Sequence, residues 1–332
     1  MKFFKASIIL LFILILSAGV AFAEDTNQTD AVGVSCDDVV SSGEKTYDDL
    51  FNVINSSAKD NIQLNEDYTY KDSDRYGAIG LYNGNYTING NNHFIDGNKQ
   101  TTAFVLENST VELKNLIIKN CNGSAIKLTN VTLKTNNVTF ENNYAKEGTI
   151  YSMQSDYFSN SDRFIDNYAF EGSSILAIKS YINIDSSVFS TSKPITWSMI
   201  RGYSSIINVE SSIFANSTSR YATAIFNDYI TTIKKSKFIN LHANATAGAV
   251  AVKGGNSLGK NLQINIENTE FINTTSVKNA GALYADINGA YGFDGTVKIL
   301  NSKFTDCASE FGGAIVQLGG NLLVSSSNFT KN

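Results

Sequence analysis

The 332-residue sequence has one proline, one tryptophan, two histidines and three cysteines. A disulfide framework or a metal centre needs several Cys or His residues at short, regular spacing. Cys36, Cys121 and Cys307 are widely separated, and His93 and His242 stand alone. The sequence therefore predicts no metal site, and it contains no pattern that indicates a cofactor.

Charge is also scarce. Charged residues make up 17% of the chain, and the formal net charge is -5. Removing an N-terminal segment that carries Lys2 and Lys5 would make it -7. Because a mildly acidic chain does not attract polyanions, we expect no nucleic-acid partner. After the first 23 residues no segment is long and apolar enough to cross a bilayer, so we expect a protein that does not span the membrane once that segment is removed.

Residues 1–23 have the pattern of a secretory signal. Lys2 and Lys5 precede an apolar run, Ile8 to Leu16, and small residues follow at Ala21 and Ala23. We expect cleavage after Ala23 and a secreted or cell-surface protein. An uncleaved membrane anchor is the alternative. Residues 24–45 are polar and predict a flexible lead-in.

A phenylalanine recurs at a nearly fixed period through the rest of the chain. The intervals between successive anchors are 24, 25, 25, 24, 33, 33 and 25 residues. The anchors are Phe140, Phe164, Phe189, Phe214, Phe238, Phe271, Phe304 and Phe329. A fixed period in this range is the signature of a solenoid.

The residues around each anchor indicate strands. Apolar residues stand seven and five positions before it, as at Ile182 and Ile184 before Phe189. Alternation at period two predicts a strand, and helical spacing is absent. A unit this small cannot bury its own apolar side, so it must stack on its neighbours. We therefore expect an all-β, single-stranded parallel β-helix of about ten coils, roughly 45 Å tall, with the Phe column inside.

The two ends of the solenoid differ. Thr46 and Asp49 predict a capping box, and Tyr47, Leu50, Phe51, Ile54 and Ala58 share one helical face. We expect residues 46–80 to form an N-terminal cap, a short helix with the first strands, over an otherwise open end. Residues 81–332 are then the coils, with no evident C-terminal cap.

Cys121 and Cys307 both stand three residues after an anchor, the position that Asn143 and Asn167 occupy in other units. Seven coils between them correspond to roughly 34 Å. A disulfide needs Cα atoms within about 7 Å, so we expect two small buried residues instead.

Asp156, Asp162, Arg163 and Asp166 form the densest charged cluster within the coils. β-Helix enzymes that cleave polysaccharides use paired carboxylates, or carboxylates that hold calcium beside a basic residue. A simpler interpretation is that Asp166 fills a polar turn position and the other side chains are solvated. No catalytic residue is predicted.

The two intervals of 33 residues carry insertions at the same phase of the coil, at Lys253–Lys260 and Asp286–Gly295. Loops from neighbouring coils would lie side by side, which favours a partner-binding face. The candidate binding residues are Lys260, Tyr284, Tyr291, Phe293 and Asp294. The alternative is two tolerated loops that bind nothing.

Eleven Asn-X-Ser/Thr sequons occur in the chain. We expect a minority to be glycosylated, with ladder positions such as Asn137 inaccessible. The candidates are Asn27, Asn55, Asn85, Asn108 and Asn244.

Three motifs carry a resemblance. Phe140-Glu-Asn-Asn143 and Phe164-Ile-Asp-Asn167 resemble one half of the polymorphic outer membrane protein repeat, and Gly312-Gly-Ala-Ile315 resembles the other half. The block that opens at Tyr86, with the helix before it, resembles adhesin-like surface proteins of methanogenic archaea. Over about residues 46–332, the resemblance implies a right-handed, pectate-lyase-like β-helix displayed at the cell surface. Its motif residues are structural, so it implies no catalytic residue.

Together these features predict a secreted or cell-surface, adhesin-like β-helix that contacts a glycan or protein surface of another cell and has no catalytic activity. Two alternatives stay open. One is a carbohydrate-active β-helix enzyme, either a polysaccharide lyase or a hydrolase. The other is a passive structural spacer of the cell envelope.

Overall fold

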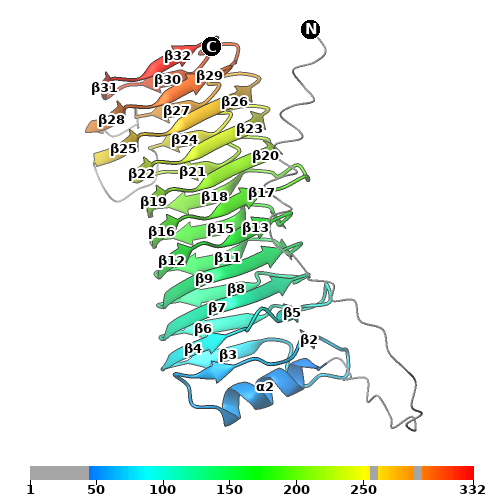
Figure 1. Ribbon diagram of the computed structural model, residues 1–332. Helices are drawn as coiled ribbons and strands as arrows, with labels where there is room; N and C mark the ends of the chain where they lie inside the picture. The colour runs from blue at the N-terminus through cyan, green and yellow to red at the C-terminus, as the bar shows by residue number, and fades with distance from the viewer. Residues whose placement is uncertain (1–44, 255–260, 288–293) are drawn as a thin grey trace, which may run out of the picture. The chain divides into compact units, whose positions relative to one another are not determined.

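The computed structural model describes residues 45–254, 261–287 and 294–332. These residues form a parallel β-helix that rises coil by coil from a single short helix (Figure 1). The predicted fold class is confirmed, and the third strand of each coil forms a ten-stranded ladder, in agreement with about ten coils. The predicted segment 1–23 and residues 24–44 of the predicted lead-in 24–45 lie outside the described residues, and Lys45 forms a parallel bridge with Tyr68.

Three parallel ladders run along the stack, and a full coil contributes one strand, or one half of a long strand, to each. The first ladder is β1 (Ile62–Gln63), β4 (Asn85–Asn89), β7 (Thr110–Lys119), β9 (Thr132–Glu141), β12 (Asp156–Asn160), β16 (Tyr181–Asp185), β19 (Ile206–Glu210), β22 (Thr231–Lys234), β25 (Asn261–Glu267), β28 (Asp294–Leu300) and β31 (Asn321–Ser325). The second is β2 (Tyr68–Thr69), β5 (Phe94–Asp96), the distal halves of β7 and β9, β13 (Arg163–Ile165), β17 (Val188–Ser190), β20 (Ile213–Ser219), β23 (Lys237–Ala243), β26 (Glu270–Ser276), β29 (Lys303–Thr305) and β32 (Asn328–Thr330). The third is β3 (Ile79–Tyr82), β6 (Phe104–Glu107), β8 (Ile126–Thr129), β11 (Gly148–Met153), β15 (Gly172–Ile178), β18 (Ser198–Tyr203), β21 (Ile225–Asn227), β24 (Val250–Lys253), β27 (Leu283–Asp286) and β30 (Ile315–Leu318). A separate pair, β10 (Tyr144–Ala145) and β14 (Tyr168–Ala169), precedes the third ladder in two coils.

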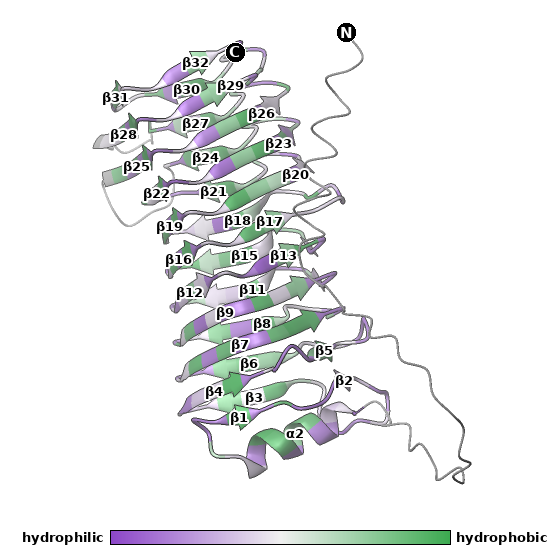
Figure 2. Cartoon of the chain, viewed as in Figure 1, coloured by the Kyte–Doolittle hydropathy of each residue, from purple (hydrophilic) through white to green (hydrophobic). Residues whose placement is uncertain are grey.

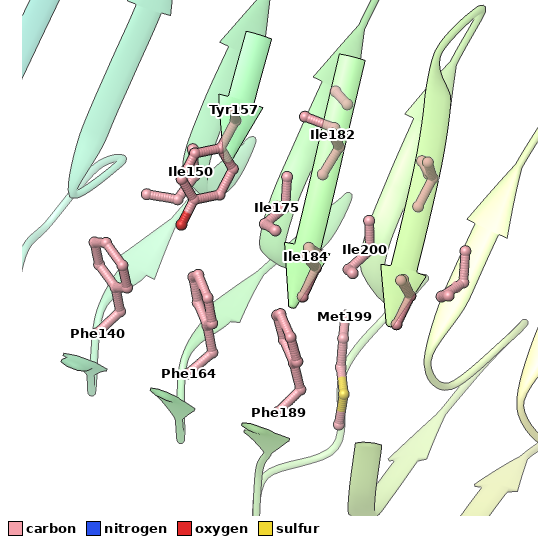
Figure 3. Packing of buried hydrophobic residues seen from close by; sticks show 14 of the residues in the cluster. Phe140, Ile150, Tyr157, Phe164, Ile175, Ile182, Ile184, Phe189, Met199 and Ile200 are labelled. Atoms are coloured by element: carbon pink, nitrogen blue, oxygen red, sulfur yellow. The ribbon is translucent and has the colours of Figure 1, made fainter. Parts of the chain in front are cut away.

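The anchor phenylalanines form the predicted internal column. Consecutive rings from Phe140 to Phe329 stack with centroids 4.6 to 5.0 Å apart. Figure 3 shows three of these rings in one file beside the isoleucines of the neighbouring ladders. Rings from Phe140 to Phe304 are buried, so each coil hides its apolar side against the next. Figure 2 shows the corresponding alternation of polar and apolar residues along the strands.

The chain turns between ladders through residues with positive φ. The corner that precedes each anchor by three residues has φ near 50°, as at Asn137, Ser186 and Asn268. Asn and Asp adopt this left-handed conformation more easily than most residues, which explains the high Asn content. At these corners Asn side chains also bond along the stack: Asn137 Nδ2 donates to Asn115 Oδ1 at 2.9 Å.

Two buried polar columns join successive coils. Two residues before the anchor, Ser or Thr oxygens accept a backbone N–H from the preceding coil, as Ser212 Oγ does from Ser187 N at 3.0 Å. Three residues after the anchor, Asn167 Oδ1 accepts from Asn143 N at 3.0 Å, while its amide donates to the Phe140 carbonyl at 2.8 Å. The Phe-x-x-Asn motif therefore supplies one stacked ring and one bridge between coils. In the same column, Cys121 and Cys307 are buried free thiols, as predicted.

Helix α2 (Tyr47–Ser56) packs on the first coil. Thr46 and Asp49 form the predicted capping box. Tyr47, Leu50 and Ile54 are buried in the main core. The prediction that Ala58 continues this apolar face was wrong, because the helix ends at Ser56 and Ala58 is exposed. At the other end, the inward row of β31 is open to solvent, with Leu322 50% exposed.

Candidate functional site

The outer face of the third ladder differs from that of the first. Its central outward row, followed by strand register, is Tyr151, Leu176, Arg201, Phe226, Ala251, Tyr284 and Val316. The corresponding outward row of the first ladder is Phe158, Asn183, Asn208, Thr232, Asn265 and Lys298. Leu176, Arg201, Ala251 and Tyr284 of this row are buried, so neighbouring side chains cover much of this face.

Aromatic side chains gather at the corner that leads into this ladder. Tyr144 and Tyr168 stack with ring centroids 5.1 Å apart, and Trp197 and Tyr221 stack at 3.9 Å. Tyr144 is 61% exposed and Phe170 is 52% exposed. These five residues, with Phe226 and Tyr284 on the outward row, are called the aromatic corner below.

The aromatic corner runs over successive coils. Gly172 N donates to the Glu147 carbonyl, and Ala222 N donates to the Trp197 carbonyl, so the segments before the third ladder are stacked in order. The first part, around Tyr144, Tyr168 and Phe170, borders a hollow of about 590 Å³. The second part, around Tyr221 and Tyr284, borders a smaller one of about 280 Å³.

Arg201 lies beneath the second part and is 6% exposed. Its Nε lies 2.8 Å from Glu171 Oε2 and donates to Tyr203 Oη at 2.7 Å. Its guanidinium carbon is 3.6 Å from the centroid of Trp197 and 4.8 Å from that of Phe226. Within the described part of the chain, Nη1 has no hydrogen-bond partner. The cation therefore fixes the aromatic side chains by ring contacts as well as by its ion pair.

Small residues pack against Tyr284 without lining the smaller hollow. Ala222, Ala247, Ala251 and Ala280 are fully buried in an apolar cluster outside the coil that also contains Tyr284. The hollow itself has aromatic walls, and Thr246, Lys253 and Asn279 add polar groups to its lining. Lys253 Nζ lies 3.8 Å from Asp286 Oδ2. The result is a hollow with aromatic walls and a polar rim.

Another hollow, of about 570 Å³, follows the corner between the third and first ladders. It is lined by turn residues such as Asn108, Asn130 and Gln154 and contains no aromatic side chain. Asn130 Nδ2 already donates to Asn108 Oδ1 at 2.8 Å. The polar lining of this hollow therefore consists of corner residues whose amides hydrogen-bond between coils, and it does not indicate a binding site.

The structure places one predicted binding residue, Tyr284, in the aromatic corner. Lys260, Tyr291 and Phe293 lie outside the described residues, and for Asp294 the structure describes only a backbone at the start of β28. The ends of the two insertions are adjacent: Lys253 pairs with Asp286, and Asn261 with Asp294.

Sequence reasoning missed Trp197, Arg201, Tyr221 and Phe226. A signal was present, because the third strand of several coils lacks alternation and reads as a continuous apolar run, as in Ile225-Phe226. A run of this kind indicates burial on both faces of a sheet.

The charged cluster between residues 156 and 166 does not converge. Asp156 and Arg163 are exposed, whereas Asp162 points into the coil and is fully buried. The expectation that Asp162 is solvated was therefore wrong. Asp166 does occupy a corner, with φ of 51°.

Asp162 takes the place of a serine in a buried polar column. Its carboxylate accepts from the Thr135 and Ser159 hydroxyls, and from Val138 N at 2.8 Å. Burial raises the pKa of Asp162 to about 6, although these hydrogen bonds lower it. Burial also raises the pKa of Tyr157, whose hydroxyl bonds to Thr135.

Three carboxylates near the second part of the aromatic corner are engaged, whereas Glu147 lines the hollow of the first part. Glu171 pairs with Arg201 and Asp286 with Lys253. Asp228 Oδ1 accepts from Ser204 N at 2.5 Å, and burial raises the pKa of Asp228. In residues 45–254, 261–287 and 294–332, no group of three or more His, Cys, Asp or Glu side chains could hold a metal ion.

Four candidate glycosylation sites, Asn55, Asn85, Asn108 and Asn244, are exposed. Asn27 lies outside the described residues. The expectation that Asn137 is inaccessible was wrong, because this corner side chain is also exposed.

Comparison with family models gives no match, and neither curated proteins nor solved structures are significantly similar to the chain. The fold itself defines a parallel β-helix protein. Among the described residues no helix has the length and apolar character needed to cross a membrane.

Proposed function

We propose that this chain is a secreted or cell-surface, adhesin-like protein that binds a glycan or protein surface of another cell through its aromatic corner, without catalysis. The observation that carries the proposal is the exposure of Tyr144 and Phe170 next to the stacked pairs Tyr144–Tyr168 and Trp197–Tyr221. Exposed aromatic faces provide large, rigid contact area at low conformational cost.

Export is part of this proposal and rests on the pattern of residues 1–23. Expression of the whole sequence in its native type of host should give a mature protein that starts at Glu24 and is found outside the cell. N-terminal sequencing of the extracellular and membrane fractions separates cleavage after Ala23 from an uncleaved anchor.

Binding without turnover is favoured by the state of the nearby carboxylates. Glycoside hydrolysis needs one carboxyl group as a proton donor and another as a nucleophile or base. Glu171 and Asp286 are each held by a cation instead. The polysaccharide lyase or hydrolase remains an alternative, which a turnover assay tests directly.

The purified protein should be applied to a glycan array and to whole cells, beside a variant in which Tyr144, Tyr168 and Phe170 are all replaced by Ser. We expect this variant to lose at least about tenfold in apparent affinity, since aromatic anchors dominate contact energies. Tyr82→Ser is the matched control, because Tyr82 is an aromatic residue 48% exposed outside the aromatic corner.

The outcomes separate the three functions. Loss of binding in the triple variant alone supports a contact protein. Release of reducing or unsaturated ends from a polysaccharide would identify an enzyme. Absence of both binding and turnover would leave the passive envelope spacer.

A further inference from the structure

A short column of flat groups runs along the outside of the coils and then stops. Arg201 lies against Trp197 at 3.6 Å, and Trp197 stacks on Tyr221 at 3.9 Å with an angle of 17° between the rings. In the next coil the equivalent position is Thr246, since Ala247 N donates to the Tyr221 carbonyl as Ala222 N does to that of Trp197. Because Thr246 has no ring, the aromatic stack ends at Tyr221, and Tyr221 and Thr246 both border the hollow of about 280 Å³. The guanidinium carbon of Arg220 lies 5.2 Å from the centroid of Tyr221.

The next aromatic wall is Tyr284. It stands two coils after Phe226 in the outward row, with Ala251 between them. Two strand spacings are about 10 Å, and van der Waals contact takes about 3.5–4 Å on each side of an inserted group. The hollow that Phe226 and Tyr284 border is therefore wide enough for one ring, not for a stack of several.

Two cations line the hollow, Arg201 and Lys253, whereas their ion-pair partners, Glu171 and Asp286, do not. Arg201 Nη1 is buried and without a hydrogen-bond partner in the described chain, which calls for an acceptor. The side chain of Lys253 is 56% exposed, and its ion pair with Asp286 is long, at 3.8 Å. Because exposed pairs of this kind are weak, the ammonium group can turn toward an incoming anion.

We propose that this pocket binds a single pyranose ring that carries an anionic substituent, as at the end of a glycan chain. The apolar face of the ring lies on Tyr221, its hydroxyls bond to Thr246 and Asn279, and the anion faces Lys253 and Arg201. Carboxylate and sulfate groups share this chemistry. The inference rests on the proposed function, because it assigns a ligand class to part of the aromatic corner.

The protein provides its own reporter, because Trp197 is its single tryptophan. The fluorescence emission of Trp197 in the intact protein should be followed during titration with methyl glucuronide, glucose 6-sulfate, methyl glucoside and inorganic sulfate. We expect a saturable change with the glucuronide or the sulfated sugar, and binding at least about tenfold weaker for the neutral glucoside and for inorganic sulfate. The two acidic sugars distinguish a carboxylate from a sulfate ligand.

Variants localise the binding. Lys253→Gln should weaken acidic-sugar binding at least about fivefold. Thr246→Tyr should abolish it, because the added ring continues the Trp197–Tyr221 stack into the hollow. Lys234→Gln, an exposed lysine on the first ladder, is the control and should bind as the parent does. Circular dichroism melting confirms that each variant is folded. If a folded Thr246→Tyr variant binds normally, the ligand is elsewhere and the proposal falls.

Other results also overturn it. If methyl glucoside binds equally well, the pocket does not require an anionic substituent. If inorganic sulfate binds equally well, it does not recognise the sugar ring. If neither acidic sugar gives a saturable change, the pocket does not bind this class of ligand. Array binding that depends on Tyr144 and Phe170 would then still support the proposed function. Conversely, an acidic-sugar titration that Thr246→Tyr abolishes, without any array binding, would support the pocket and reject the surface-contact role.

Discussion

Two sets of stacked rings follow the axis of this β-helix, one inside the coils and one outside. The inner column is continuous from Phe140 to Phe329, with nearly parallel rings in every coil. The outer set consists of two short stacks, Tyr144–Tyr168 and Trp197–Tyr221. Both follow from the same backbone spacing, since strands in register place equivalent side chains about 4.8 Å apart.

The inner column and the outer stacks differ in how much stability the protein loses when a ring is missing. A missing ring inside leaves a cavity that the coils above and below cannot fill. A missing ring outside, as at Thr246, leaves a hollow that solvent or a ligand can occupy. The inner column is therefore constrained by stability, whereas the outer one is free to carry function.

The strongest test of this comparison is a ring deletion in each column. Phe214→Ala should lower the free energy of unfolding by about 3–5 kcal/mol, because it removes a fully buried ring that stacks on two neighbours. Tyr144→Ala, at a position 61% exposed, should cost less than about 0.5 kcal/mol. Urea denaturation followed by circular dichroism measures both. Similar costs for the two variants would refute the distinction between inner and outer rings.

Asp162 offers a second test, on the polar part of the interior. Its folded pKa of about 6 lies above the unfolded value of 3.8, so the folded state binds the proton more tightly. The stabilisation of the folded state by the protonated Asp162 carboxyl group is fully present below about pH 4. It is lost as the pH rises through about 6, and the total loss in the free energy of unfolding is about 3 kcal/mol. Asp162→Ser, which restores the residue type of Ser187 and Ser212, should therefore stabilise the protein by about 1–3 kcal/mol at pH 8 and little at pH 4.5.

The measurement is the difference in unfolding free energy between parent and variant at several pH values. Asp156→Ser is the matched control, because Asp156 lies on the same coil and is exposed. A parent and an Asp162→Ser variant with parallel pH profiles would show that the buried carboxyl is not the titrating group.

The inner column was predictable from the sequence because burial leaves few choices. An anchor every 24 to 33 residues, with alternating residues before it, admits one architecture. The corner residues were predictable for a similar reason, since left-handed φ favours Asn. Even the burial of Asp162 had a signal, because it stands two residues before its anchor, where Ser187 and Ser212 stand before theirs.

The outer site was harder to predict. Trp197 and Tyr221 lie in the turn before the third ladder, where the sequence has no fixed pattern. Arg201 pairs with Glu171 from the preceding coil, next to a shift in the register between β15 and β18 that the sequence pattern does not indicate. The two insertions were a guide to this region, because Lys253 stands at the edge of the pocket and Tyr284 forms part of it.

Replacement of Arg201 tests how the outer rings are held. Arg201→Met should destabilise the protein by about 2 kcal/mol, since it removes the 2.8 Å ion pair and leaves Glu171 partly buried without its cation. The emission of Trp197 should also shift as the guanidinium leaves its face. Arg201→Lys keeps the charge and should recover part of the stability but not the ring contacts. If emission and stability both stay at parent values, Arg201 does not position the aromatic side chains.

The smallest expected effect separates backbone conformation from side-chain bonding at the exposed corners. Asn240 has φ of 54°, accepts from Asn273 Nδ2 at 2.9 Å and donates to Asn216 Oδ1 at 3.1 Å. Asn240→Ala should cost about 1 kcal/mol, because alanine disfavours left-handed φ. Asn240→Gly removes the same hydrogen bonds but tolerates this φ, so it should change the unfolding free energy by less than about 0.5 kcal/mol. Equal losses for the two variants in urea denaturation would mean that the amide bonds along the stack, and not the corner conformation, select asparagine.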